Sequence, residues 1–147
     1  MIVYHAGNFA REPERMWIST SIDGVTWTPR FQISQPNGEA SNGFPAIAAG
    51  LSAGDFRVVW QGDNGDREGW NTFFRQTTDG GATWSETVRL SDRGRGAPYK
   101  SNAGYQFPYG DYLSLSVDGD GVNHVIWGEG ASYDGPGGSW YTRGGKL

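Results

Sequence analysis

The sequence contains no cysteine, so it can form neither a disulfide bond nor a thiolate metal site. No apolar run approaches the roughly 18 residues of a membrane-spanning helix, and no segment has helical periodicity long enough to predict a helix. Positive charge is scarce as well: a net charge of -4 argues against a broad nucleic-acid interface. The chain begins in an apolar strand and shows no signal peptide. These absences predict no membrane segment, no nucleic-acid partner, no metal and no cofactor.

Glycine and aromatic residues, in contrast, are abundant. Glycine accounts for 24 of the 147 residues, and 14% of the residues are aromatic. Glycine adopts the positive φ that many tight turns require. The hydrophobic fraction is only 36%, as expected where outer strands face water. This composition predicts an all-β fold of short strands and tight turns.

One short motif occurs twice: a hydroxyl residue, Asp, Gly and then Thr-Trp. The two copies span Ser21–Trp27 and Thr77–Trp84. The carboxylate is expected to cap nearby backbone N–H groups while glycine takes the turn, and the Trp supplies a large ring to bury. The residues expected to play this structural role are Ser21, Asp23, Gly24, Trp27, Thr77, Asp79, Gly81 and Trp84.

The repeat extends beyond the turn. An apolar strand ending in an aromatic residue precedes each motif, with 23 residues from Tyr4 to Trp27 and 24 from Trp60 to Trp84. A third such strand ends at Trp127 without a motif after it. Each unit therefore reads as four short antiparallel strands separated by Gly and Asp turns. The expected strands are 2–4, 15–19, 28–34, 44–49, 57–60, 70–75, 85–91, 112–117, 124–127 and 139–143.

This motif resembles the Asp-box, or BNR repeat, of sialidase-like β-propellers. Thr77–Trp84 fits the pattern at every position and Ser21–Trp27 fits with one residue deleted, while Gly110–Trp127 resembles a blade opening of secreted bacterial members. The resemblance implies a partial β-propeller of about two and a half to three four-stranded blades, six-bladed if completed. The blades would be residues 1–38, 39–104 and 105–147. The resemblance also implies that the full-length form is secreted or at the cell surface.

A closed propeller needs about four to eight blades. Open blade edges rich in aromatic residues are an aggregation hazard. The sequence therefore predicts one of two arrangements. Either the chain belongs to a longer propeller with a further N-terminal half, or its copies assemble as a homo-oligomer, and the two arrangements are compatible with each other.

The resemblance implies a catalytic set of an arginine cluster, a Tyr/Glu nucleophile pair and an Asp acid/base. Tyr112 with Leu115 matches the Tyr-x-x-Leu context of such a nucleophile, and Glu129 is a candidate partner by proximity. No arginine enters the matching strand before Phe44, and the family's Phe-Arg-Ile-Pro motif is absent. The catalytic set is thus incomplete. The structural alternative for Tyr112 is an aromatic strand residue packing beside Asp111.

Aromatic and polar residues gather between positions 93 and 109, where they suit sugar binding because sugar C–H faces pack on rings. The candidate glycan-binding residues are Asp111, Tyr105, Tyr109 and Arg143. The alternative is that these rings only cover the gap between blades. Two functional classes result: a glycan-directed propeller, as a binding module or part of a glycoside hydrolase, or a non-catalytic interaction propeller that self-assembles.

Asp118-Gly-Asp120-Gly121 resembles the start of a calcium loop but lacks the further ligands that such a loop needs. A hairpin turn is the better prediction. His5 and His124 lie on separate expected strands and do not suggest a metal site, and His124 is expected on a half-buried strand.

Overall fold

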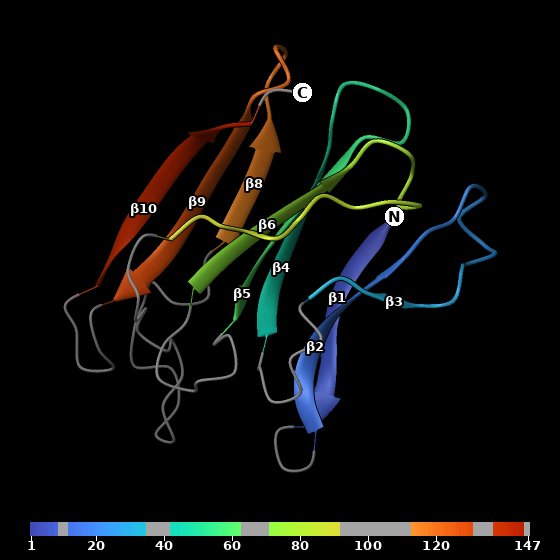
Figure 1. Cartoon of the computed structure of the whole chain (residues 1–147), viewed down its shortest axis with the longest axis horizontal. Helices are drawn as coiled ribbons and strands as arrows, with labels where there is room; N and C mark the ends of the chain where they lie inside the picture. Colours follow the sequence, from blue (N-terminus) through green and yellow to red (C-terminus); the bar gives the residue numbers. More distant parts are fainter. Residues whose placement is uncertain (9–11, 35–41, 63–70, 92–112, 131–136, 146–147) are drawn as a thin grey trace.

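The computed structural model describes residues 1–8, 12–34, 42–62, 71–91, 113–130 and 137–145, which form β-strands and contain no helix. The same residues therefore include no helix that could cross a membrane. Three separate antiparallel sheets result, and none of them closes on itself within this part of the chain. The all-β expectation is confirmed (Figure 1).

The strands of each sheet follow one another in sequence. Sheet I consists of β1 (Ile2–Asn8), β2 (Glu12–Ser19) and β3 (Phe31–Gln32). Sheet II consists of β4 (Asn42–Ala49), β5 (Phe56–Gly62), β6 (Asn71–Thr77) and β7 (Val88–Arg89). Sheet III consists of β8 (Leu113–Val117), β9 (Asn123–Gly130) and β10 (Gly137–Gly144).

The strands expected after the two turn motifs are shorter than predicted. Segments 28–34 and 85–91 pair regularly only at Phe31–Gln32 and Val88–Arg89. Elsewhere these segments contact the neighbouring strand through isolated backbone hydrogen bonds. Ile33 N–H donates to the Met16 carbonyl, and Leu90 N–H donates to the Thr72 carbonyl. Side chains replace part of the ladder, because the Ser85 hydroxyl accepts the Gln76 N–H. The sequence pattern predicted the position of these strands but not this partial pairing.

Each sheet has two faces, which strand alternation defines. In β5, Val58 and Trp60 point toward sheet I, whereas Val59 points toward sheet III. We call the face directed from sheet I toward sheet III the front face of each sheet, and the opposite face its back face. The front of sheet I thus packs on the back of sheet II, and the front of sheet II packs on the back of sheet III.

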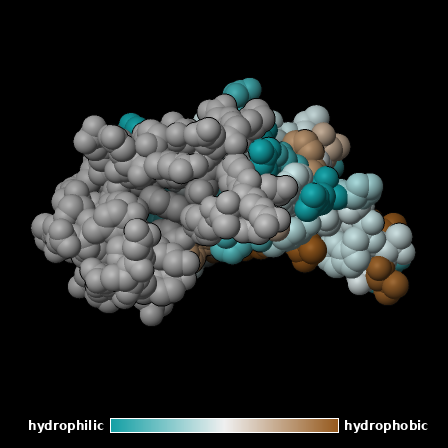
Figure 2. All heavy atoms as spheres, turned by 90° about the horizontal axis from the view of Figure 1, so that it is seen from below, coloured by the Kyte–Doolittle hydropathy of each residue, from teal (hydrophilic) through white to brown (hydrophobic). Residues whose placement is uncertain are grey.

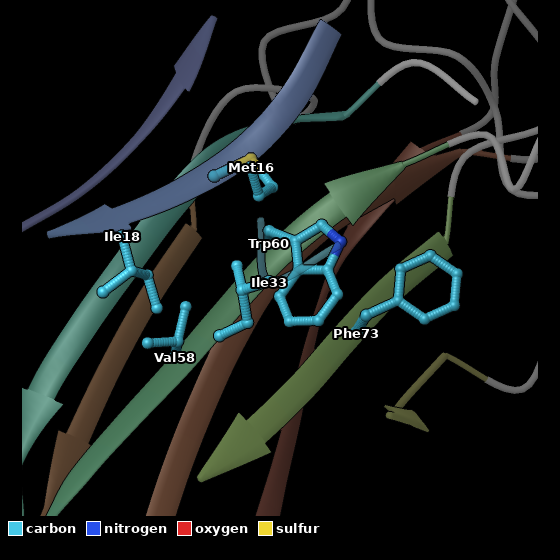
Figure 3. Close-up of a cluster of buried hydrophobic side chains, with 6 residues drawn as sticks. All are labelled: Met16, Ile18, Ile33, Val58, Trp60 and Phe73. Atoms are coloured by element: carbon cyan, nitrogen blue, oxygen red, sulfur yellow. The ribbon is translucent and has the colours of Figure 1, made fainter. Parts of the chain in front are cut away.

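Two apolar cores fill these junctions. The first is shown in Figure 3 and consists of Met16, Ile18, Ile33, Val58, Trp60 and Phe73. The second consists of Val59, Phe74, Leu115, Val125 and Trp127. Neither core belongs to one sheet alone, so each sheet buries its apolar residues only by stacking on a neighbour.

The strand ends define two edges that the three sheets share. At the turn edge lie the two turn motifs and the tight turns β4–β5 and β8–β9. At the loop edge lie the opposite strand ends, including Asn42, Gly62 and Asn71 of sheet II and Gly130 and Gly137 of sheet III. Bonds between sheets align these edges, because Gln61 Nε2 donates to the Gly128 carbonyl.

Candidate functional site

The second turn motif is held together by its carboxylate. Asp79 Oδ1 accepts the Thr77 hydroxyl at 2.7 Å and the Thr83 N–H at 2.9 Å, and Oδ2 accepts the Thr83 hydroxyl at 2.6 Å. These bonds, led by the Thr83 hydroxyl, hold the pKa of Asp79 well below its usual range. Gly81 has φ +99, which favours glycine. The turn uses its polar atoms internally.

The first turn motif has the same design. Asp23 Oδ1 accepts the N–H groups of Val25 and Thr26 at 2.8 Å each, together with the Ser21 hydroxyl at 2.9 Å. The backbone bond from Thr26 contributes most to the lowered pKa of Asp23. Gly24 has φ +73.

The two motifs differ in what their tryptophans contact. Trp84 packs against the first core, and a Cβ added at Gly81 would meet Met1 of sheet I at 3.2 Å. Trp27 is 41% exposed. Its expected burial is therefore wrong, because the motif of sheet II rests on sheet I, whereas no described sheet lies behind sheet I. Figure 2 shows apolar residues at the surface at this end of the molecule.

The glycan and catalytic candidates fall largely outside the described residues. This applies to Tyr105, Tyr109, Asp111 and Tyr112. Glu129 lies in β9 opposite Gly138, at the loop edge. Arg143 lies in β10 opposite His124, at the turn edge, which is about 17 Å away along the strand at about 3.4 Å per residue. The structure therefore does not bring Glu129 and Arg143 together.

At the loop edge of sheet II, the structure groups buried polar residues that sequence reasoning missed. Asn42 Oδ1 accepts the Trp60 indole N–H at 3.2 Å, and its Nδ2 donates to the Glu14 carbonyl of sheet I at 3.1 Å. Asn71 accepts the hydroxyl of buried Ser91 at 2.9 Å. A polar residue in a strand that otherwise reads as apolar was the available signal.

Two side-chain atoms in this group have no hydrogen-bond partner among the described residues. They are Gln61 Oε1 and Thr72 Oγ1, which belong to a directly paired couple of residues on the front face of sheet II. Beside them, β4 carries a bulge, and Phe44 has φ +51. Bulges and positive φ at a non-glycine residue are frequent near functional sites. The loop edge of sheet II is therefore the first candidate site.

A buried cation connects sheets II and III. Arg57 is 1% exposed, and its guanidinium donates to both oxygens of Asp55 at 2.7 Å. Its third bond, also 2.7 Å, reaches Asn123 Oδ1 across the junction. Asn123 in turn donates to the Gly145 carbonyl. The bonds from Arg57 lower the pKa of Asp55, so the pair is ionised, and the bond from Arg57 to Asn123 joins the two sheets.

A second carboxylate-held group lies on the front face of sheet III. His124 Nε2 is 2.9 Å from Asp118 Oδ2, and its Nδ1 is 2.7 Å from the Tyr141 hydroxyl. Because an ionised carboxylate only accepts, Nε2 carries a proton, and in the neutral imidazole Nδ1 accepts from Tyr141. The bond from His124, followed by those from backbone N–H groups, lowers the pKa of Asp118 to about 2. Asp118 also caps a hairpin turn through the Asp120 and Val122 N–H groups, which confirms that turn.

Among the described residues, no group of three or more His, Cys, Asp or Glu side chains could hold a metal ion. No protein-family model matches the chain, and no curated protein matches it either. Arguments about its function therefore depend on the geometry of the sheets and on the resemblance of its turn motifs.

Proposed function

We propose that the chain is part of an Asp-box β-propeller of the sialidase-like type and that it acts as a glycan-directed module. The observation that carries the propeller proposal is the uniform stacking: each sheet places its front face on the back face of the next. Radial repetition of sheets in one direction is the principle of a propeller. The two turn motifs, each held by hydrogen bonds to its own carboxylate, support the same proposal.

The glycan-binding surface is proposed at the loop edge. The chain enters β8 there from the segment that carries Tyr105, Tyr109, Asp111 and Tyr112, and Glu129 lies at the same edge. The bulged β4 and the Gln61–Thr72 couple lie at this edge of sheet II. Arg143 is left out of the proposed surface because it lies at the turn edge. Binding rather than hydrolysis is proposed, since the sequence lacks the arginines of a sialidase-type catalytic set.

A glycan array with the whole chain tests this proposal. On any glycan that binds, we expect Glu129→Gln and Asp111→Asn to weaken binding about tenfold or more, since each removes a charge at the proposed surface. Arg143→Gln is the matched control, because it changes one charge at the opposite edge and is expected to leave binding unchanged. Loss of binding in the control alone, or no binding to any glycan, overturns the glycan-directed function.

A second candidate is a non-catalytic interaction module, and a specific observation favours it. The front face of sheet III is uncovered in the described residues and carries large exposed side chains, with Ile126 47% and Tyr141 57% exposed. Soluble monomers seldom leave such groups together on one face.

A further inference from the structure

The front faces of sheets II and III match position by position. Ala46 pairs with Val59 and Val59 with Phe74 in sheet II, just as Ser114 pairs with Ile126 and Ile126 with Tyr141 in sheet III. The next row matches as well. Its pairs are Ala48 with Arg57 and Arg57 with Gln76 in sheet II, and Ser116 with His124 and His124 with Arg143 in sheet III.

The matching extends to a polar side chain that a carboxylate orients, namely Arg57 in sheet II and His124 in sheet III. In sheet II a carboxylate from the turn, Asp55, orients Arg57, and Arg57 donates to the next sheet. In sheet III a carboxylate from the turn, Asp118, orients His124. Position 124 thus holds a polar side chain, oriented by a carboxylate, at the position where sheet II uses Arg57 to bind its neighbour.

The other uncovered face among the described residues is the back of sheet I. Tyr4 pairs with Trp17 there as Trp60 pairs with Phe73 in sheet II, and as Trp127 pairs with Trp140 in sheet III. Ile2, two residues before Tyr4 on the same face, is 43% exposed. Sheet I therefore presents on its back the same arrangement that sheet III presents to sheet II.

We propose that the front face of sheet III binds the back face of sheet I of a second copy of this chain. The inference rests on the front-to-back stacking of the proposed propeller and adds the partner that continues it. The interface is heterologous, because different faces meet, and a pair of copies can close a ring through two such contacts. Two copies supply six sheets.

Composition supports a contact between separate chains rather than a dry core. Relative to sheet II, the front of sheet III carries Ser in place of Ala twice and Tyr in place of Phe once. The back of sheet I carries Tyr4, and the guanidinium of Arg30 lies 4.2 Å from the Trp17 ring centre. Tyr, Trp and Arg are the residues enriched at protein–protein interfaces.

Sedimentation or light scattering over a wide concentration range tests the proposal. The expected species has twice the 16.0 kDa of the chain. Ile126→Arg and Ile2→Arg each place a charge in one partner face, and each alone is expected to weaken the dimer about tenfold or more. Val25→Arg, at a position 83% exposed in the first turn motif, is the control and is expected to dimerise normally. Circular dichroism verifies that all three variants fold.

Mixing the two face variants determines the geometry. Ile126→Arg keeps an intact back face and Ile2→Arg keeps an intact front face, so their mixture is expected to form a heterodimer through one contact. A monomer at all concentrations, an Ile2→Arg variant that still dimerises normally, or a mixture that stays monomeric overturns the proposal. A monomer that binds a glycan leaves the proposed function standing, and a dimer that binds none removes only the glycan-directed function.

Discussion

The front faces of sheets II and III share one register, yet one is a core and the other is open. Val59 and Phe74 are 0% and 9% exposed because sheet III covers them. Their counterparts Ile126 and Tyr141 are about half exposed. Covered and open faces therefore differ by what lies on them more than by their backbone.

The residues also differ in a consistent direction. The open face has gained hydroxyl groups at positions where the covered face is purely apolar, while its side chains keep nearly the same shape. A buried hydroxyl without a partner is costly, but a hydroxyl at a hydrated interface is not. The open face is thus suited to a partner that binds reversibly, and the covered face is suited to a permanent contact between sheets.

The largest expected difference between the faces is the loss of stability when Arg57 or its counterpart His124 is removed. Arg57→Ala leaves the carboxylate of Asp55 buried without its cation, so we expect a loss of about 3–5 kcal/mol in the free energy of unfolding. His124→Ala, at the matching open position, is expected to cost less than about 1 kcal/mol. Urea denaturation at a concentration where the chain is monomeric measures both. Equal losses would contradict the distinction between a junction and an open face.

Exchanging one hydroxyl between the faces is expected to have a smaller effect. Phe74→Tyr places a hydroxyl in the second core and should destabilise the fold by about 1–3 kcal/mol. Tyr141→Phe removes one from the open face and should change stability by about 0.5 kcal/mol or less. Thermal unfolding of the two variants beside the wild type provides the comparison. A neutral Phe74→Tyr would mean that the front of sheet II is not dry.

The smallest effect is the acid response of the open face. The pKa of Asp118 in the folded chain, about 2, lies below its ordinary value of 3.8. Its stabilising contribution is therefore complete above pH 3.8 and is lost as the pH falls toward 2. The difference in free energy of unfolding between wild type and Asp118→Asn should therefore narrow as the pH falls from 3.8 toward 2. A difference between wild type and Asp118→Asn that does not narrow would rule out this role of the carboxylate.

The sequence predicted the features that depend on neighbouring residues. The repeated order of apolar segments and Gly or Asp turns predicted most strands, and the Asp-Gly turn motif predicted its own hydrogen bonds, because these interactions lie within a few positions. The partial pairing around Phe31 could not be predicted, since it depends on side chains that replace backbone acceptors. The Ser34 hydroxyl accepts the Met16 N–H, and the Thr28 hydroxyl accepts the Thr20 N–H.

Contacts between sheets could not be predicted from one sequence for a related reason. Arg57 and Asn123 are separated by 66 positions, and only the stacking brings them together. The exposure of Trp27 likewise depends on a neighbouring sheet rather than on its own motif. For the candidate site, sequence analysis named Glu129 as a catalytic candidate and Arg143 as a glycan-binding candidate. It could not show that they lie at opposite ends of one hairpin.

The most direct test of the proposed contact is the reactivity of two tyrosines at rising protein concentration. Nitration of Tyr141, on the front of sheet III, and of Tyr4, on the back of sheet I, can be followed separately by mass spectrometry of peptides. We expect both tyrosines to become protected together as the concentration increases, and Ile126→Arg to abolish the protection of both. Nitration rates that stay constant while the concentration rises would contradict the proposed contact.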